Sequence, residues 1–398
     1  MPEPRDANAE SATIGVLFGE ALAAPEAVWS LRAAGHQVQV ISRIGSSPPA
    51  SRIREVETLQ VCAPEQSLSG CRRDLGRVVR DFGIDLLMPL DDVGVLVTGG
   101  SEFGAHLVGP RNERARLALD KVLQIEAARQ VGLPVPRTES ITTPADFRWA
   151  GPFPVVVKPA DAVTVIDDRV CKGPTRVCAD QGELDDAVSS LPHGYRYLVQ
   201  ELLHGEGRGV FGLSKGGRVV HMSGHRRVRM MNPLGSGSSA CAPVGVAEEV
   251  AHRCERFVEQ LDWSGMFMVE LLLVADGRHW FMELNGRPWG SLALARRRGF
   301  EYPAWAVLLD AEPEYVPQVS ELSDVRLCRN LAYEILHLFF VLRGPRTRSD
   351  IEWPTFWATL ISLVRIGRGH RWYNWNRRQP TLLLHDVVWT LKRILMKK

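Results

Sequence analysis

The sequence predicts a mixed α/β protein in which a domain with a parallel, doubly wound sheet precedes a second, α+β domain. Three observations predict this class. Over residues 13–110, short apolar runs alternate with helical stretches, which is the rhythm of βαβ units. Residues 266–290 hold two β-rich runs on either side of Asp276-Gly277, a dipeptide favoured in tight hairpins. The last 80 residues have apolar residues at helical spacing, so a helical C-terminal region is expected.

Composition limits the classes of function. A chain of 398 residues is long enough for two or three domains, and a formal net charge of +2 gives no general field for binding nucleic acid. The charge is uneven, because residues 316–398 carry 14 basic and 6 acidic residues, a net charge of +8. Seven cysteines without a C-x-x-C pair indicate a reducing compartment rather than a disulfide framework.

The first residues of the chain lack the basic and apolar regions of a signal peptide. Residues 1–12 are acidic and polar, so we expect a disordered leader and not a signal peptide. No run approaches the roughly 18 apolar residues that a membrane span requires. We therefore expect a soluble, cytoplasmic protein.

The first domain has strands expected at residues 13–18, 37–42, 58–63, 84–90 and 106–109, with helices at 25–34 and 71–82. Gly15 and Gly19 follow the first strand without the G-x-G-x-x-G spacing, which favours a close-packed turn over a dinucleotide site. Asp91 and Asp92 stand at the carboxyl end of a strand, where such sheets bind ligands. They could contact a substrate, although acidic loop residues are more often simply solvated, and solvation is the favoured interpretation.

Two lysines stand beside expected elements of the second domain. Residues 111–131 predict one long helix that contains Lys121, closed by Gly132. A β-branched strand at 152–159 ends at Lys158, which could hold charge near a cleft or extend to water. The loop that follows contains Lys172-Gly173.

A strand at 195–203 leads into the glycine-rich stretch 204–213, and then a basic set spans His225 to Arg229. The small-residue loop at 232–243 could cradle an anion through its backbone amides or be a mobile turn; the basic residues around it favour the anion.

Three helices are expected near the C-terminus, at residues 327–342, 354–366 and 381–396. The last is basic and amphipathic. It could rest on an anionic membrane surface, although packing against the main body is the favoured interpretation. Trp372, Trp375, Arg377 and Arg378 are too few for a nucleic-acid platform.

The hairpin at 266–290 brings two acids together. If Asp276-Gly277 forms a two-residue turn, Glu270 lies opposite Glu283, and alternation places Asn285 on the same face. Like charges across a ladder are unfavourable, so one glutamate must face solvent while the other pairs with a residue such as Arg287, or a cation must lie between them. Two carboxylates and an amide oxygen are ligands that suit Mg²⁺, with Mn²⁺ as the alternative metal.

Taken in order, these segments resemble the ATP-grasp superfamily, in the branch of the biotin carboxylase and carbamoyl phosphate synthase domains. The resemblance covers residues from about 13 to 310 and rests on DK followed by GLPVP, VVVKP, VQELLHGEG, and VEL with MELNGRPWG. It implies a Rossmann-like domain at 13–110, an ATP-grasp domain at 111–315 with a mobile lid near 137–199, and a basic helical region at 316–398.

The resemblance also implies roles for particular residues. Glu270, Glu283 and Asn285 would hold the Mg²⁺ of MgATP, Lys121 and Lys158 would contact phosphates, and Arg287 would contact the transferring phosphate or the acceptor. Gln200, Glu201, Leu202 and Leu203 would form the hinge against adenine, and Lys172 and Glu206 would complete the nucleotide set. Arg226 and Arg227 are the expected contacts of the acceptor carboxylate. The stretch after Lys158 departs from the family, because it has only Gly173 where a multi-glycine loop is usual.

The implied activity is ATP-dependent ligation of a small-molecule carboxylate to an amine through an acyl phosphate. The alternatives are a carbamoyl phosphate synthase-like or carboxylate kinase activity, and a non-catalytic nucleotide-binding module. A homodimer, and contact with a membrane or a partner through the basic C-terminus, stay open at this point. Nucleic acid is not an expected partner.

Overall fold

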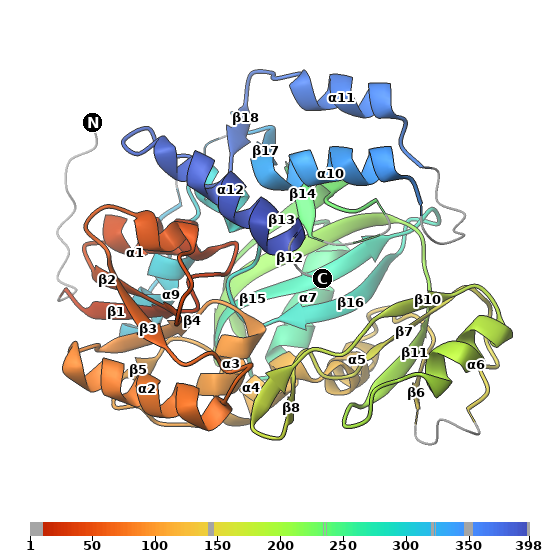
Figure 1. Ribbon diagram of the computed structural model, residues 1–398, viewed down its shortest axis with the longest axis horizontal. Helices are drawn as coiled ribbons and strands as arrows, with labels where there is room; N and C mark the ends of the chain where they lie inside the picture. The colour runs from red at the N-terminus through yellow and green to blue at the C-terminus, as the bar shows by residue number, and fades with distance from the viewer. Residues whose placement is uncertain are drawn as a thin grey trace.

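The computed structural model describes residues 11–141, 147–233, 235, 237–319, 322, 324–345 and 353–395. Most of the expected leader, residues 1–10, lies outside them. Three sheets organise the described chain: a parallel sheet, a small lid sheet and a large central sheet, with the C-terminal helices packed at one end of the molecule (Figure 1).

The N-terminal sheet is parallel and five-stranded, as the sequence predicts, with the order β3-β2-β1-β4-β5. Its elements are β1 (Thr13–Leu17), α1 (Ala24–Ala33), β2 (Gln37–Arg43), the 3-10 turn η1 (Pro49–Arg52), β3 (Glu57–Val61), α2 (Leu68–Asp81), β4 (Leu86–Pro89), α3 (Asp92–Thr98) and β5 (His106–Leu107). β1 is almost wholly buried because it lies in the middle of this sheet.

The stretch predicted as one helix at 111–131 is two helices, α4 (Asn112–Leu119) and α5 (Lys121–Gln130). Asp120 adopts an extended backbone and caps α5, since its carboxylate accepts from the N–H groups of Val122 at 2.9 Å and Leu123 at 3.3 Å. The cap places Lys121 at the first turn of α5.

The lid sheet has the order β10-β7-β11-β6 and its own hydrophobic core. It contains β6 (Thr138–Ile141), β7 (Val155–Pro159), β10 (Arg176–Cys178) and β11 (Tyr197–Glu201), with α6 (Gln181–Ser189) packed on it. A separate two-stranded hairpin, β8 (Thr164–Ile166) and β9 (Arg169–Cys171), extends from it.

The central sheet has seven strands in the order β16-β15-β12-β13-β14-β17-β18. They are β12 (Glu206–Lys215), β13 (Arg218–Met230), β14 (Ser238–Val244), β15 (Gly265–Leu273), β16 (His279–Asn285), β17 (Leu327–Arg329) and β18 (His370–Trp372). The helices α7 (Glu248–Gln260), α8 (Leu292–Arg297) and α9 (Tyr302–Ala311) pack around them. Two hydrophobic cores join this sheet to the N-terminal domain.

The C-terminal region is not purely helical, because β17 and β18 extend the central sheet. Its helices are α10 (Leu331–Arg343), α11 (Phe356–Val364) and α12 (Thr381–Leu395). α12 packs against the main body through Leu382, Asp386 and Thr390, which is the outcome favoured from sequence. No helix in the described ranges is long and apolar enough to cross a membrane.

Candidate functional site

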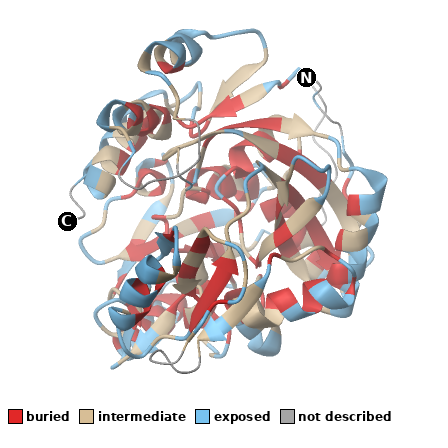
Figure 2. Cartoon of the chain, turned by 90° about the vertical axis from the view of Figure 1, so that its right-hand side faces the viewer, coloured by how far each residue is buried: buried red, intermediate tan, exposed pale blue. Residues whose placement is uncertain are grey.

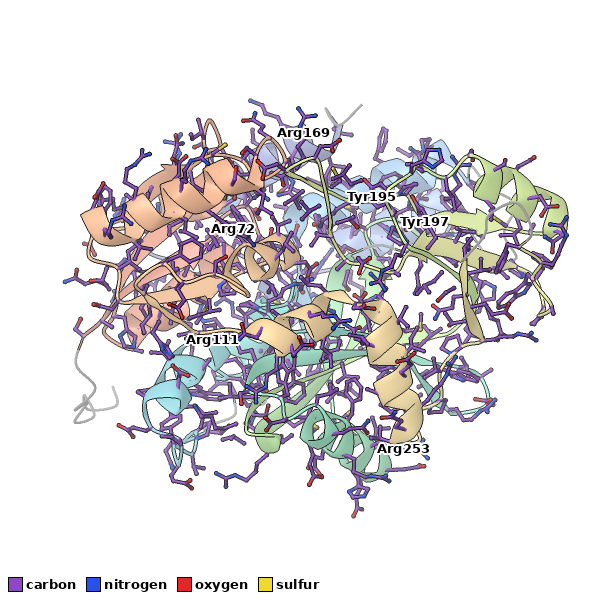
Figure 3. All side chains as sticks on the ribbon, turned by 90° about the horizontal axis from the view of Figure 1, so that it is seen from below. Arg72, Arg111, Arg169, Tyr195, Tyr197 and Arg253 are labelled. Atoms are coloured by element: carbon purple, nitrogen blue, oxygen red, sulfur yellow. The ribbon has the colours of Figure 1, made fainter. Side chains whose placement is uncertain are left out.

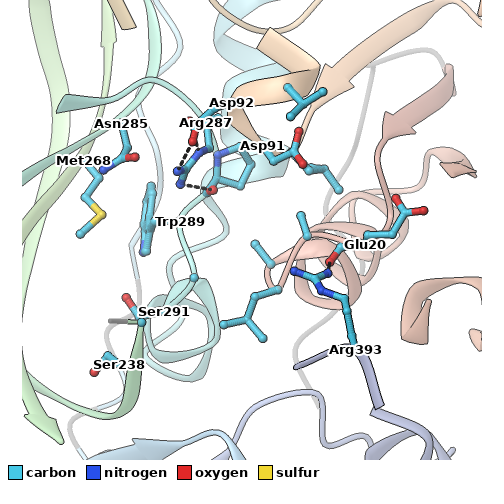
Figure 4. A pocket seen from close by; sticks show the side chains of 18 of the residues that line it. Glu20, Asp91, Asp92, Ser238, Met268, Asn285, Arg287, Trp289, Ser291 and Arg393 are labelled. Atoms are coloured by element: carbon cyan, nitrogen blue, oxygen red, sulfur yellow. Dashed lines mark hydrogen bonds and ion pairs between the residues drawn. The ribbon is translucent and has the colours of Figure 1, made fainter. Parts of the chain in front are cut away.

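A cavity of about 1070 Å³ opens between the N-terminal domain, the central sheet and the C-terminal helices (Figure 4). One wall is the face of the central sheet, with Glu270, Glu283 and Asn285. A second wall is the carboxyl end of the N-terminal sheet, and a third is made by α10 and α12. The position agrees with the rule that open α/β sheets bind ligands at the carboxyl ends of their strands.

Glu270 lies opposite Glu283 across β15 and β16, so the predicted pairing is confirmed. The predicted turn is wrong. The Gly277 N–H donates to Val274 O at 3.0 Å, and among Asp276 and Gly277 only the glycine has positive φ, at 84°. This longer turn shifts the register by one residue, and a bulge at Met282 shifts it back before Glu283. The one-residue shift at the turn and the one-residue bulge cancel, so Glu270 and Glu283 still lie opposite each other.

Two glycines of β12 clear the sheet face beside this pair. Gly209 lies between His225 on β13 and Glu270 on β15, and a Cβ on it would meet His225 Nε2 at 2.8 Å. A Cβ on Gly207 would meet Arg227 Cδ at 2.7 Å. The glycine-rich stretch noted in the sequence therefore has a structural reason, because it lets two side chains of β13 lie across β12 toward Glu270.

Arg227 forms an ion pair with Glu270. Burial and the neighbouring Glu283 carboxylate nevertheless raise the pKa of Glu270, with Arg227 opposing them. Asn285 Nδ2 donates to Glu283 Oε1 at 3.2 Å, which leaves the amide oxygen of Asn285 as a donor atom for a metal. The acidic pair is thus partly compensated by the protein, which the sequence argument did not foresee.

Carboxylate and amide oxygens fit Mg²⁺, which keeps water or phosphate as its other ligands. In the described residues no cluster of three or more His, Cys, Asp or Glu side chains could hold a metal by itself. Glu270, Glu283 and Asn285 are therefore a partial ligand set, and a bound phosphate would have to complete it.

Lysines from two other elements face the acidic pair. Lys158 Nζ, on β7, donates to Gln200 Oε1 at 2.7 Å, and burial lowers the pKa of Lys158 to about 8, with Glu283 opposing the shift and Lys121 adding to it. Lys121 lines a smaller cavity of about 110 Å³ together with Glu283 and Asn285. The structure thus brings both predicted phosphate contacts to the metal-ligand candidates.

Arg287 is held by Asp92, with Nε and Nη2 donating to its two carboxylate oxygens at 2.9 and 3.2 Å (dashed in Figure 4). Burial alone would raise the pKa of Asp92, but Arg287 outweighs it and the pKa is lowered. Asp91 caps α3 by accepting from the Gly94 N–H at 2.7 Å. The expectation that both aspartates are simply solvated is wrong, because one orients Arg287 and the other starts a helix.

The stretch after Lys158 covers the cavity without a multi-glycine loop. The β8–β9 hairpin docks on the N-terminal domain: the Leu68 N–H donates to Asp168 O at 2.6 Å and the Val170 N–H to Pro64 O at 2.9 Å. In Figure 3, Arg169 of this hairpin lies beside α2. Docking places Val170 and Lys172 in the cavity wall.

The hinge candidates are the last two residues of β11, Gln200 and Glu201, and the two that follow it, Leu202 and Leu203. The Glu201 N–H donates to Arg137 O at 2.9 Å and the Leu202 N–H to Pro154 O at 3.0 Å, which fixes the backbone of this segment up to Leu202. Gln200 is tied on both sides, because its Nε2 donates to Thr138 Oγ1 at 2.8 Å. None of the four lines the large cavity.

Arg226 does not face the cavity, so its expected role as an acceptor contact is wrong. Alternation along β13 puts it on the opposite face from Arg227, where it pairs with Glu206 at 3.4 Å. Glu206 lies on that same far face, held also by Arg208 at 2.5 Å. Neither Arg226 nor Glu206 lines the large cavity.

Sequence reasoning missed the far end of the cavity. Arg43 pairs with Glu20 at 3.2 Å and Glu65 at 2.8 Å, and Arg393 Nη1 of α12 donates to Glu20 O at 2.9 Å. Trp389 lies beneath Arg393, with 4.8 Å from the guanidinium carbon to the ring centre. Only the position of Arg43 at the carboxyl end of its strand could have signalled this end of the site.

Comparisons with known proteins agree with this architecture. Residues 118–291 match the family model described as an ATP-grasp domain. The L-amino acid ligase from Bacillus licheniformis is 17% identical, covering 80% of this chain and 78% of that one, with a TM-score of 0.60. The ADP complex of purK, N5-carboxyaminoimidazole ribonucleotide synthetase, is 12% identical, with coverages of 87% and 90% and a TM-score of 0.61.

The complex of biotin carboxylase from Campylobacter jejuni with β,γ-ATP is 14% identical, with coverages of 78% and 73% and a TM-score of 0.59. No curated protein matches the chain in sequence. At these identities the likeness to solved structures establishes the fold.

Proposed function

We propose that this chain, whose residues 118–291 form an ATP-grasp domain, is an ATP-dependent ligase that joins a carboxylate to an amine through an acyl phosphate. The observation that carries the proposal is the cross-strand pair Glu270 and Glu283, with Asn285 beside it and Lys158, Lys121 and Arg287 facing the same space. Oxygen ligands surrounded by cations suit magnesium and a polyphosphate.

The three metal-ligand candidates would hold Mg²⁺, which when bound offsets the negative charge of the phosphate oxygens. Lys158 and Lys121 bind phosphate from the lid side and from the first turn of α5. Arg287, oriented by Asp92, stabilises charge on the transferring phosphoryl group. Little covalent work falls to the protein, so alignment of carboxylate and phosphate provides much of the rate.

Arg227 is the candidate for binding the acceptor carboxylate. It lies in the cavity wall and is paired with Glu270, so a metal on Glu270 would free part of its hydrogen-bonding capacity. The docked β8–β9 hairpin keeps water from the acyl phosphate, which would otherwise be hydrolysed before the amine attacks. A ligase needs water to be excluded, because hydrolysis of the acyl phosphate would consume ATP without forming the amide.

The test uses purified full-length protein with MgATP and a panel of carboxylates and amines, with ADP as the readout. We expect ADP only when both a carboxylate and an amine are present. A carboxylate labelled with ¹⁸O should pass one label to inorganic phosphate, because the bridging oxygen of an acyl phosphate leaves with the phosphoryl group. Phosphate without label, from a reaction that forms the amide, would contradict the intermediate.

The same assay separates the alternatives. A phosphorylated product formed without an amine would show a carboxylate kinase activity, and a phosphorylated product formed from bicarbonate and ammonia would show a carbamoyl phosphate synthase-like activity. Tight binding of a nucleotide with no ADP under any condition would show a non-catalytic module.

A further inference from the structure

The helix α11 exposes apolar side chains that an ordinary surface helix would bury. Its nine residues, FWATLISLV, include no charged side chain, yet the only one fully buried is Thr359. Trp357, Ile361 and Val364 are 69%, 61% and 67% exposed. Figure 2 shows α11 at the top of the view with its outer side exposed. A helix with apolar residues all round is normally buried, so the outer face of α11 lacks a covering surface in this chain.

The neighbouring helix α10 presents a second apolar stripe. Ile335, Phe339 and Leu342 recur at spacings of four and three residues, which places them on one side of α10, and all are more than two-fifths exposed. α10 and α11 pack against each other, and Trp353 Nε1 donates to Val341 O at 3.2 Å between them. The two stripes therefore belong to one helical hairpin.

The exposed charges that directly follow α11 are basic. Ile366, itself exposed, is flanked by the exposed side chains of Arg365 and Arg368. Residues 353–369, which contain α11, carry no charged side chain other than Arg365 and Arg368. An apolar surface rimmed by arginines would attract a partner with an apolar interior and an anionic surface.

We propose that the outer face of the α10–α11 hairpin docks on an anionic lipid bilayer. Neither helix can span a membrane, so they would lie in its interface, with Trp357 at the depth that tryptophan prefers. A second copy of this chain is a poorer occupant, because a two-fold contact would bring together two faces that each carry Arg365 and Arg368, and residues 353–369 hold no acid to pair with them. The surface is distinct from α12, which packs on the main body.

The test is co-sedimentation of the full-length protein with vesicles of phosphatidylcholine alone or mixed with phosphatidylglycerol. We expect binding only to the mixed vesicles, weakening as salt is raised. The double variant Trp357→Ser, Ile361→Ser should bind roughly tenfold more weakly because two exposed apolar side chains no longer insert. Arg365→Glu with Arg368→Glu should lose a similar factor.

Matched controls carry the same changes elsewhere on the surface. Ile44→Ser with Phe82→Ser removes two exposed apolar side chains of the N-terminal domain, and Arg77→Glu with Arg116→Glu reverses two exposed charges. Both should bind vesicles like the wild type, and all four variants should melt like it. Absence of binding by the wild type, equal binding to neutral vesicles, equal losses in the controls, or a dimer that the Trp357 variant dissociates would overturn the proposal.

Discussion

At the scale of single residues, the site is a balance between acids and cations that each need the other. Glu270 is paired with Arg227 and Asp92 with Arg287, whereas Glu283 accepts from the Asn285 amide and interacts over longer distances with Lys158, Arg227 and Arg287. Because Glu283 forms no ion pair with the described residues, its carboxylate is the one most available to a metal.

Glu283→Gln should therefore lower ADP formation roughly a hundredfold or more, since the neutral amide cannot hold Mg²⁺ at the phosphates. The thermal midpoint should not fall, because the change removes a like charge beside Glu270. Glu255→Gln, on the exposed side of α7, is the control. Substantial turnover by the Glu283→Gln variant, measured by a coupled ADP assay, would take Glu283 out of the metal site.

The lowered pKa of Lys158 predicts that the activity depends on pH. Burial lowers its pKa to about 8, so its ammonium is present below pH 8 and is lost as the pH rises through that value. We expect kcat/KM for MgATP, which reports the free enzyme, to decline above about pH 8. Lys158→Arg keeps a charge throughout and should remove this inflection. A flat wild-type profile, or the same inflection in the variant, would contradict the assignment.

At the scale of elements, the β8–β9 hairpin has a docking contact that the sequence did not reveal. Asp168 Oδ2 accepts from Ser67 Oγ at 2.6 Å and Ser69 Oγ at 2.8 Å, and Oδ1 accepts from the Ser69 N–H at 2.9 Å, at the first turn of α2. These hydrogen bonds lower the pKa of Asp168. They join the lid to the N-terminal domain.

Asp168→Ala should loosen this lid contact. We expect faster hydrogen exchange over residues 164–171, a severalfold higher KM for MgATP, and more ADP released per amide formed because water reaches the intermediate. Asp167→Ala is a matched control, since Asp167 is exposed and also has positive φ, 48° against 61° for Asp168. Equal effects from both variants would assign the change to backbone strain and not to the contact.

The glycines of β12 predict a packing effect. A methyl group at Gly209 would meet two rigid rings, His225 Nε2 and Phe211 Cζ, both at 2.8 Å. Gly209→Ala should destabilise the fold by about 1–3 kcal/mol and push the His225 ring away from Glu270. Gly245→Ala has open space around its Cβ and serves as the control. Denaturant unfolding measures the difference, and a Gly209 variant as stable as the wild type would refute the crowding.

At the scale of the whole molecule, what the sequence could predict depended on how local each feature is. The βαβ rhythm and the facing of Glu270 and Glu283 are local patterns, and both were predicted. The prediction of the acidic pair succeeded although its turn was wrong, because the Met282 bulge offset the longer loop. Arg226 was misplaced because residue type alone does not say which face of a strand a side chain occupies.

The far end of the cavity could not be predicted, because it joins residues distant in the chain. Glu20 and Arg393 are 373 positions apart, and nothing local marks either one. Their contact depends on α12 crossing to the N-terminal domain, where Leu382 enters a core shared with the central sheet. Such a contact depends on tertiary packing, and the spacing of residues in the sequence does not indicate it.

This end of the cavity makes a prediction about the acceptor. Arg393→Ala removes a cation from the wall farthest from the metal-ligand candidates, so KM for the acceptor carboxylate or amine should rise severalfold while KM for MgATP stays unchanged. Lys392→Ala, its exposed neighbour on α12, is the matched control and should change neither constant. Steady-state kinetics with the substrates found in the panel measures both. An equal rise in KM for MgATP would mean that α12 acts through the stability of the whole cavity and not on the acceptor, because a residue that contacts only the acceptor cannot weaken nucleotide binding.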